Sequence, residues 1–216
     1  LAVNLSVWLA RWGRKVLLVD GDLGLASLDV LLGLAPRRTV EHLLSGASTI
    51  EDLLLEGPGG LRLLPAVSGV PRIGSLDCGA RTRLLAALSE ASRSTDHLIV
   101  DTSAGLGEDS LSLQLAAERV VIITTPEPGS LVNAYASLKF LWSADPGKRV
   151  DLGVNATSGD SEARQAFRQV ADVAGRFLGR EPGFLGAVHY DPLLIDAVQR
   201  QRAVVDHLAA PHRQAA

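Results

Sequence analysis

Short apolar runs alternate with longer amphipathic stretches along most of this chain. The run from Val16 to Val19 is apolar at every position, which is typical of a strand buried on both faces of a parallel sheet. This alternation of strand and helix patterns predicts an α/β fold, a doubly wound, mainly parallel sheet with helices on both faces. The strands are expected at 16–20, 61–65, 97–101, 119–125, 150–155 and 184–189.

The amphipathic stretches predict the helices. Helices are expected at 1–13, after Thr39 and after Thr49, and at 80–93, 131–142, 160–178 and 193–201, with a short one in the tail. The first of them places Leu1, Leu5, Trp8, Leu9 and Trp12 on one face. In the helix at 160–178, the inward side chains are expected to be Ala163, Phe167, Val170, Ala174 and Phe177.

Acidic residues stand where two of the predicted strands end. Asp20 and Asp22 follow the first apolar run, and Asp101 closes the strand at 97–101. Ligands of open α/β sheets bind beyond the carboxyl ends of the strands, so these carboxylates are placed to meet a bound metal or a polarised water. Aspartate and glycine are also common in ordinary turns, and that interpretation stays open at this stage.

Composition excludes several classes of protein. The 216 residues suit a single domain, and the formal net charge of −3 gives no electrostatic case for direct nucleic-acid binding. The longest apolar runs fall short of the ~20 residues that span a bilayer. The single Cys78 cannot form an internal disulfide, and no Cys/His cluster offers a zinc site. These features predict a soluble, cytoplasmic protein.

Two long motifs carry a family resemblance. The stretch DGDLGLASLDVLLGL, which begins at Asp20, is similar to the segment D-x-D-L-G-L-A-N-x-D-x-L-L-G of the MinD/ParA family of P-loop ATPases. TTPEPGS, which begins at Thr124, also resembles a signature of that family, and DTSAG at Asp101 resembles its switch segment. Within the family, the chain most resembles the flagellar-number regulators called FlhG or FleN.

The resemblance implies ATP and Mg²⁺ as cofactors and assigns roles to five residues. Asp22 would orient or polarise the attacking water, and Asp101 would hold Mg²⁺ directly or through water, with Gly105 in the loop that responds to the γ-phosphate. Asn155 stands where the family has an adenine reader, and Asp191 keeps the spacing of the loop that closes over the base. An ordinary loop asparagine remains an equal interpretation of Asn155, because the family's next residue, arginine, is alanine in this chain.

The family's first strand and its phosphate loop, K-G-G-V-G-K-[ST], have no counterpart in these 216 residues. The sequence has no Met, and its first helix has no capping residue, so we expect a single MinD/ParA-like nucleotide-binding domain, 1–216, truncated at its N-terminus. The parent protein would be an ATP hydrolase, whereas the 216-residue chain should not bind ATP saturably.

The resemblance further implies an ATP-dependent dimerisation switch that regulates flagellar number or placement. Its partners would be a second copy when ATP is bound, and flagellar switch or export proteins or a flagellar transcription activator. Two alternatives remain, a non-catalytic interaction paralogue and a ParA-like ATPase for partitioning or polar localisation. Membrane-bound members of the family end in a basic amphipathic helix, and the tail of this chain has too little apolar area to support peripheral binding to the inner face of the cell membrane.

Overall fold

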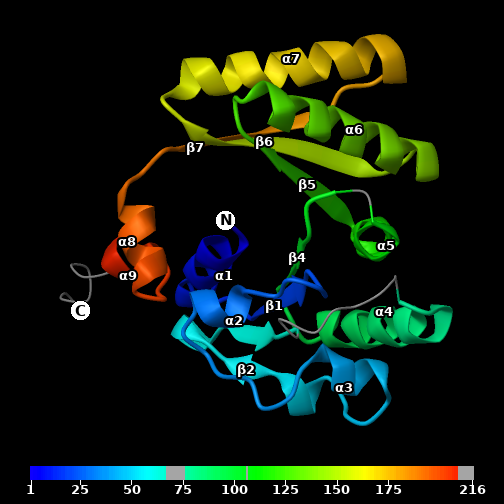
Figure 1. The fold of residues 1–216 in the computed structure, drawn as a ribbon, viewed down its shortest axis with the longest axis vertical. Coiled ribbons are helices and arrows are strands. Elements are labelled where there is room, and N and C mark those ends of the chain that lie inside the picture. Colours follow the sequence, from blue (N-terminus) through cyan, green and yellow to red (C-terminus); the bar gives the residue numbers. More distant parts are fainter. Residues whose placement is uncertain (67–75, 106, 209–216) are drawn as a thin grey trace. The chain divides into compact units, whose positions relative to one another are not determined.

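The computed structural model describes residues 1–66, 76–105 and 107–208, which fall into two compact units (Figure 1). Unit 1 comprises Leu1–Ser103 with the segment that starts at Pro192, and unit 2 comprises Ala104–Asp191. The elements of unit 1 are α1 (Ala2–Arg11), β1 (Val16–Gly21), α2 (Leu28–Leu31), α3 (Val40–Leu44), η1 (Glu51–Leu53), β2 (Leu55–Glu56), η2 (Pro58–Gly60), β3 (Arg62–Leu64), α4 (Cys78–Ser92), β4 (His97–Thr102), α8 (Leu193–Gln199) and α9 (Val205–Leu208). Those of unit 2 are α5 (Glu108–Ala116), β5 (Arg119–Thr124), α6 (Pro128–Ala144), β6 (Arg149–Thr157), α7 (Asp160–Leu178) and β7 (Gly183–His189).

The sheet of unit 1 has β1 at its centre. Its strand order is β2-β3-β1-β4, in which β1 pairs in parallel with β3 and β4, and β2 pairs antiparallel with β3. Every residue of β1 is buried, so both faces of this strand are covered, as its unbroken apolar run predicts. Val16 and Leu18 pack in one core cluster with Val3 and Val7 of α1.

Helix α1 carries apolar side chains on two opposite faces. The smaller residues Val3, Val7 and Ala10 are buried in the core. Of the predicted face, Leu1, Leu5, Trp8 and Trp12 are exposed, Trp12 to 71%, whereas Leu9 is half-buried and packs against the core. The rings of Trp8 and Trp12 lie against each other with 5.0 Å between their centroids.

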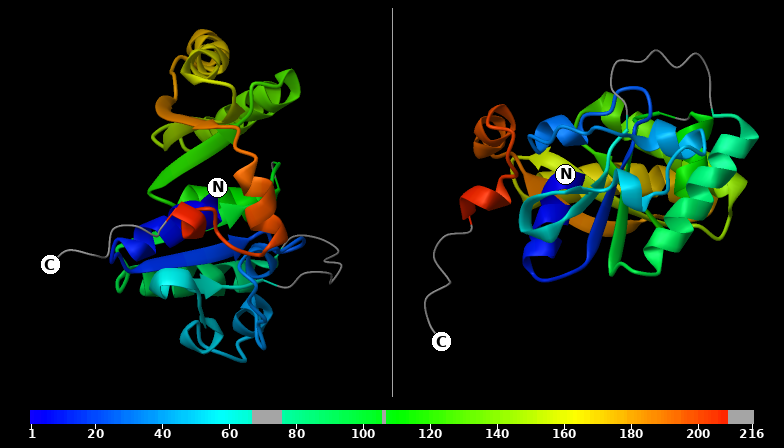
Figure 2. Two further views of the ribbon diagram at one scale, coloured as in Figure 1. Left: turned by 90° about the vertical axis from the view of Figure 1, so that its left-hand side faces the viewer. Right: turned by 90° about the horizontal axis from the view of Figure 1, so that it is seen from below.

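The segment from Pro192 returns to α1 (Figure 2). The amide of Val204 donates to Asn4 Oδ1 at 2.7 Å, and Arg11 forms an ion pair with Asp206. Ala203 is buried in the same core cluster as α1. The predicted tail helix exists as α9, and the residues after Leu208 lie outside the described chain.

Unit 2 is a three-stranded parallel sheet with the order β5-β6-β7. Helices α6 and α7 lie on the same side of this sheet (Figure 1 and the left view of Figure 2). Leu152 and Val154 of β6 pack beneath them with Leu138 of α6 and Val170 of α7.

The fold prediction is confirmed, because each of the six expected strands is present and the strand pairs are mainly parallel. Several details differ. The helix expected after Thr49 is the 3₁₀ helix η1, and α5 was not expected. Phe177, expected to face inward, is 65% exposed, and its neighbour Leu178 packs against the core instead. Within the described residues, no helix is long and apolar enough to cross a bilayer. The single-domain assignment stays a prediction.

Candidate functional site

Two acidic strand ends meet at one edge of the unit 1 sheet. Asp20 of β1 and Asp101 of β4 are direct register partners on adjacent parallel strands. Asp22 follows two residues after Asp20, and its charge acts on the Asp101 carboxyl. Parallel strands place their carboxyl ends at the same edge, which is why residues about 80 positions apart in the sequence come together here.

Asp20 is 3% exposed and is bonded at both carboxylate oxygens. Oδ1 accepts the amide of Asp22 at 3.2 Å, and Oδ2 accepts the amides of Ser27 at 3.0 Å and Leu28 at 3.1 Å. Burial raises the pKa of the Asp20 carboxyl above its ordinary value, and the three amide bonds offset part of that rise. The sequence shows an acidic strand end at this position but gives no sign that its oxygens are already engaged.

Asp22 is half-buried and stands in the loop between β1 and α2. Its Oδ1 accepts the amides of Leu25 at 3.1 Å and Gly24 at 3.4 Å. Since these bonds use one carboxylate oxygen, Oδ2 keeps acceptor capacity for a water or a ligand.

Asp101 is exposed on the edge strand β4, yet the protein around its carboxylate removes enough water to raise its pKa. The negative charge of Asp22 adds to this rise. The cluster therefore favours a bound cation, because a positive charge would relieve the repulsion between these carboxylates.

The donor set fits Mg²⁺ in the form that nucleotide-binding proteins use. Among the described residues, no group of three or more His, Cys, Asp or Glu side chains could hold a metal by itself. Mg²⁺ usually keeps several waters and binds one or two carboxylates together with substrate phosphates. Asp22 and Asp101 could supply such carboxylate oxygens, with the remaining ligands coming from water and a nucleotide.

The other predicted site residues belong to unit 2. Gly105 has a φ of 113°, a backbone conformation that favours glycine. Asn155 is half-buried near the end of β6, where the register with β7 shifts, and Ala156 beside it adopts a φ of 56°. Asp191 is exposed just after β7. The structure places these residues but does not test the roles that the family resemblance gives them.

The TTPEPGS motif forms the turn between β5 and α6. The hydroxyl of Ser130 lies 2.9 Å from the hydroxyl of Thr124 and accepts the amide of Thr125 at 2.9 Å. Pro128 is the first residue of α6, a position that suits proline because the first amides of a helix have no partner within it. Glu127 is exposed at the start of this helix, and its contacts within the described part of the chain assign it no role.

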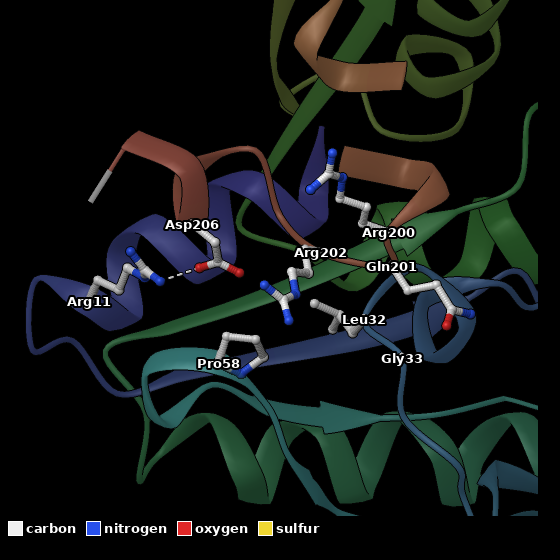
Figure 3. Close-up of a pocket in the computed structure, with 8 residues that line it drawn as sticks. All are labelled: Arg11, Leu32, Gly33, Pro58, Arg200, Gln201, Arg202 and Asp206. Carbon is white, nitrogen blue, oxygen red and sulfur yellow. Dashed lines mark hydrogen bonds and ion pairs between the residues drawn. The ribbon is translucent and has the colours of Figure 1, made fainter. Parts of the chain in front are cut away.

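A separate pocket of about 560 Å³ lies in unit 1 and is lined by other residues (Figure 3). Its lining includes Arg11, Leu32, Pro58, Arg202 and Asp206, and the ion pair between Arg11 and Asp206 crosses one side of it. No predicted site residue contributes to this pocket, so it does not mark the candidate site.

Comparison with known proteins gives close relatives over nearly the whole chain. It is 40% identical over 205 residues to the antiactivator FleN of Pseudomonas aeruginosa, a match that covers 95% of this chain and 73% of FleN. It is 29% identical over 210 residues to the flagellum site-determining protein YlxH of Helicobacter pylori, covering 97% of this chain and 70% of YlxH.

Solved structures agree with these relatives. A chain of the MinC:MinD cell division protein complex of Aquifex aeolicus superposes with a TM-score of 0.75 and 27% identity, covering 94% of this chain and 81% of that one. No family model matches the chain.

Proposed function

We infer the function from a premise that the comparisons establish: this chain belongs to the MinD/ParA family of ATPases and is close to the FleN/FlhG regulators of flagellar number. The family prediction made from the motifs at Asp20 and Thr124 is thereby confirmed. A member of this family with relatives named antiactivator and flagellum site-determining protein acts in flagellar patterning.

Our proposal is that the protein is an ATP-dependent dimerisation switch that regulates flagellar number or placement. The observation that carries it is the pairing of Asp20 with Asp101 at the ends of β1 and β4, which sets the loop containing Asp22 beside Asp101. An edge of a parallel sheet that gathers carboxylates is where a phosphate-bound metal ion is expected in this type of fold.

Each carboxylate has a separate task in this proposal. Asp22 orients the attacking water through its free oxygen, while Leu25 and Gly24 hold its other oxygen in place. Asp101 holds Mg²⁺ directly or through a water. The ion, when bound, supplies charge neutralisation for the phosphates, and the protein contributes mainly positioning.

Regulation requires that ATP distinguishes two states of the protein. ATP must bind the dimer more tightly than the monomer, by about 5.5 kcal/mol for a shift from 1:99 to 99:1. The ATP-bound dimer would then present a surface to flagellar switch or export proteins, or to a flagellar transcription activator, and hydrolysis would release it. Asn155 and Asp191 would contact the base in this state.

Replacing Asp22 with Ala in the product of the complete gene tests the proposal. We expect ATP binding and ATP-dependent dimerisation to persist and hydrolysis to slow at least tenfold, because a positioned general base typically contributes about 10²–10⁴-fold. Asp172→Ala, which removes an exposed carboxylate of α7, is the control. Unchanged turnover in Asp22→Ala would remove Asp22 from the mechanism.

Sequencing upstream of the Leu1 codon separates this proposal from a non-catalytic interaction protein. An in-frame GKGGVGK[ST] stretch would support the ATPase, since its amides and lysines bind phosphates. A stop codon followed by a genuine start would instead support the interaction protein.

A further inference from the structure

Asp20, near the end of β1, forms hydrogen bonds to both ends of the loop that carries Asp22. Its carboxylate bonds the amide of Asp22, where the loop begins, and the amides of Ser27 and Leu28, where the loop enters α2. One side chain therefore joins both ends of a seven-residue segment, 22–28. These bonds tie the beginning of the segment to its end and so help to fix its path.

The three bonds also satisfy donors that have few other partners. The first amides of a helix have no acceptor within it, and those of Ser27 and Leu28 stand at the start of α2. Leu28 is buried, so its amide would lose a bond that water could not readily replace. Removal of the Asp20 carboxylate should therefore release the end of the loop at Leu28 together with its beginning at Asp22.

Asp20 is also poorly placed to act on a ligand itself. At 3% exposure it is closed to bulk water, and both of its oxygens already accept backbone amides. Asp22, by contrast, is half-buried, and among the described residues its hydrogen bonds use only one of its two carboxylate oxygens. Of the two aspartates of the D-x-D motif, therefore, only Asp22 has a carboxylate oxygen available to a water or a ligand.

We propose that Asp20 is a positioning residue, which acts on the reaction only by holding the 22–28 loop and thereby the Asp22 carboxylate. This inference rests on the proposed function for the reaction it serves, while the loop geometry can be measured without any nucleotide. The two parts are therefore tested separately.

Amide hydrogen exchange of the 216-residue chain tests the loop. In Asp20→Ala, exchange of the Asp22, Ser27 and Leu28 amides should accelerate at least tenfold, while the amides of β1 keep their protection. Asp20→Asn, which retains one acceptor oxygen, should lie between that variant and the unchanged chain, and it serves as the test if Asp20→Ala does not fold. Unchanged protection of the three amides in a folded variant would overturn the proposal.

A matched control shows that the effect is local. Asp52 is another aspartate that accepts a backbone amide, from Thr49 at 3.0 Å, and it lies on the surface. Asp52→Ala should accelerate exchange at Thr49 and leave the 22–28 loop unchanged. Acceleration of the loop amides in this control as well would indicate general destabilisation and would overturn the specific role of Asp20.

A double-mutant cycle in the product of the complete gene tests the route through Asp22. Asp20→Asn should lower kcat about tenfold with the Kd for a non-hydrolysable ATP analogue changed less than twofold. The double variant Asp20→Asn/Asp22→Ala should be no slower than Asp22→Ala, because residues that act through one group are not additive. If the reductions in kcat of the two single variants multiplied in the double variant, the proposal would be overturned. Absence of hydrolysis in the unchanged protein would instead overturn the proposed function, and the exchange result would still decide the role of Asp20 in the loop.

Discussion

Asp20 and Asp101 are register partners and lie side by side on the adjacent parallel strands β1 and β4. Burial raises the pKa of both carboxyls, and in each case a neighbouring carboxylate raises it further. Their situations nevertheless differ, since Asp20 is closed in by its own loop and Asp101 stands on an exposed strand. The carboxyl ends of these two strands therefore bring together a buried carboxylate that accepts backbone amides and a carboxylate on an exposed residue.

Replacing Asp101 with Asn should raise the Mg²⁺ concentration needed for half-maximal ATP hydrolysis by roughly tenfold or more, the size of effect that loss of metal-site groups produces. Asparagine keeps the shape of the side chain but removes the charge that attracts the ion. Mg²⁺ titrations of the complete gene product would measure this, with Asp172→Asn as control. An unchanged Mg²⁺ requirement would exclude Asp101 as a ligand.

Glu162 gives a prediction about pH. In the first turn of α7 its Oε2 accepts the amide of Ser158 at 2.6 Å and the Ser158 hydroxyl at 2.8 Å, and these bonds lower the pKa of its carboxyl. A lowered folded-state pKa contributes stability above the ordinary value of 4.5, and that contribution is lost as the pH falls through the folded-state pKa.

Glu162→Ala should therefore lower the urea midpoint of unfolding at pH 7, and its difference from the unchanged chain should narrow below pH 4.5. Urea unfolding monitored by circular dichroism at pH 7 and pH 3 would measure the difference. Asp172→Ala, on the exposed side of the same helix, should show no such narrowing. A constant difference at both pH values would contradict the role of the Glu162 charge.

The sequence predicts the strands and the acidic edge well, for a clear physical reason. Parallel strands place their carboxyl ends at the same end of a sheet, so two apolar runs that each end in aspartate predict that Asp20 and Asp101 share that end. That β1 and β4 are neighbours, which makes the two aspartates register partners, comes from the structure. The sequence does not predict that Asp20 is buried and bonded at both carboxylate oxygens while Asp22 is bonded at only one. This difference depends on which backbone amides of the loop point toward each carboxylate. A D-x-D pattern carries no information about those amides.

Helical periodicity was ambiguous in two places. Helix α1 has an apolar stripe on each side, and the pattern alone does not tell which of the two packs in the core. In α7 the periodic stripe is correct as far as Ala174 but fails at Phe177, in the last turn, where Leu178 packs against the core. Helical periodicity shows which residues share a face of a helix. It does not show at which turn the core that covers this face ends.

The contact between Gly183 and Asp151 is likewise invisible in the sequence and gives the last prediction. They are register partners on β7 and β6, and a Cβ added to Gly183 would meet Asp151 Oδ1. Asp151 is 8% exposed, and its Oδ2 accepts Nε of Arg119 at 2.5 Å. Gly183 therefore leaves room for the ion pair between the exposed Arg119 of β5 and the buried Asp151 of β6.

Gly183→Ala should lower the free energy of unfolding by about 1–3 kcal/mol, because overpacking displaces the Asp151 carboxylate from Arg119. Gly129→Ala is the matched control, since Gly129 lies in the first turn of α6 with nothing within 4 Å of the added Cβ. Alanine is the better helix former, so this variant should gain about 0.5–1 kcal/mol. Urea unfolding of both variants, and of Gly183→Ala in an Asp151→Ala background, would separate the causes. If the carboxylate is the obstacle, its removal abolishes the penalty of Gly183→Ala, whereas a penalty that persists would assign it to the backbone of β7.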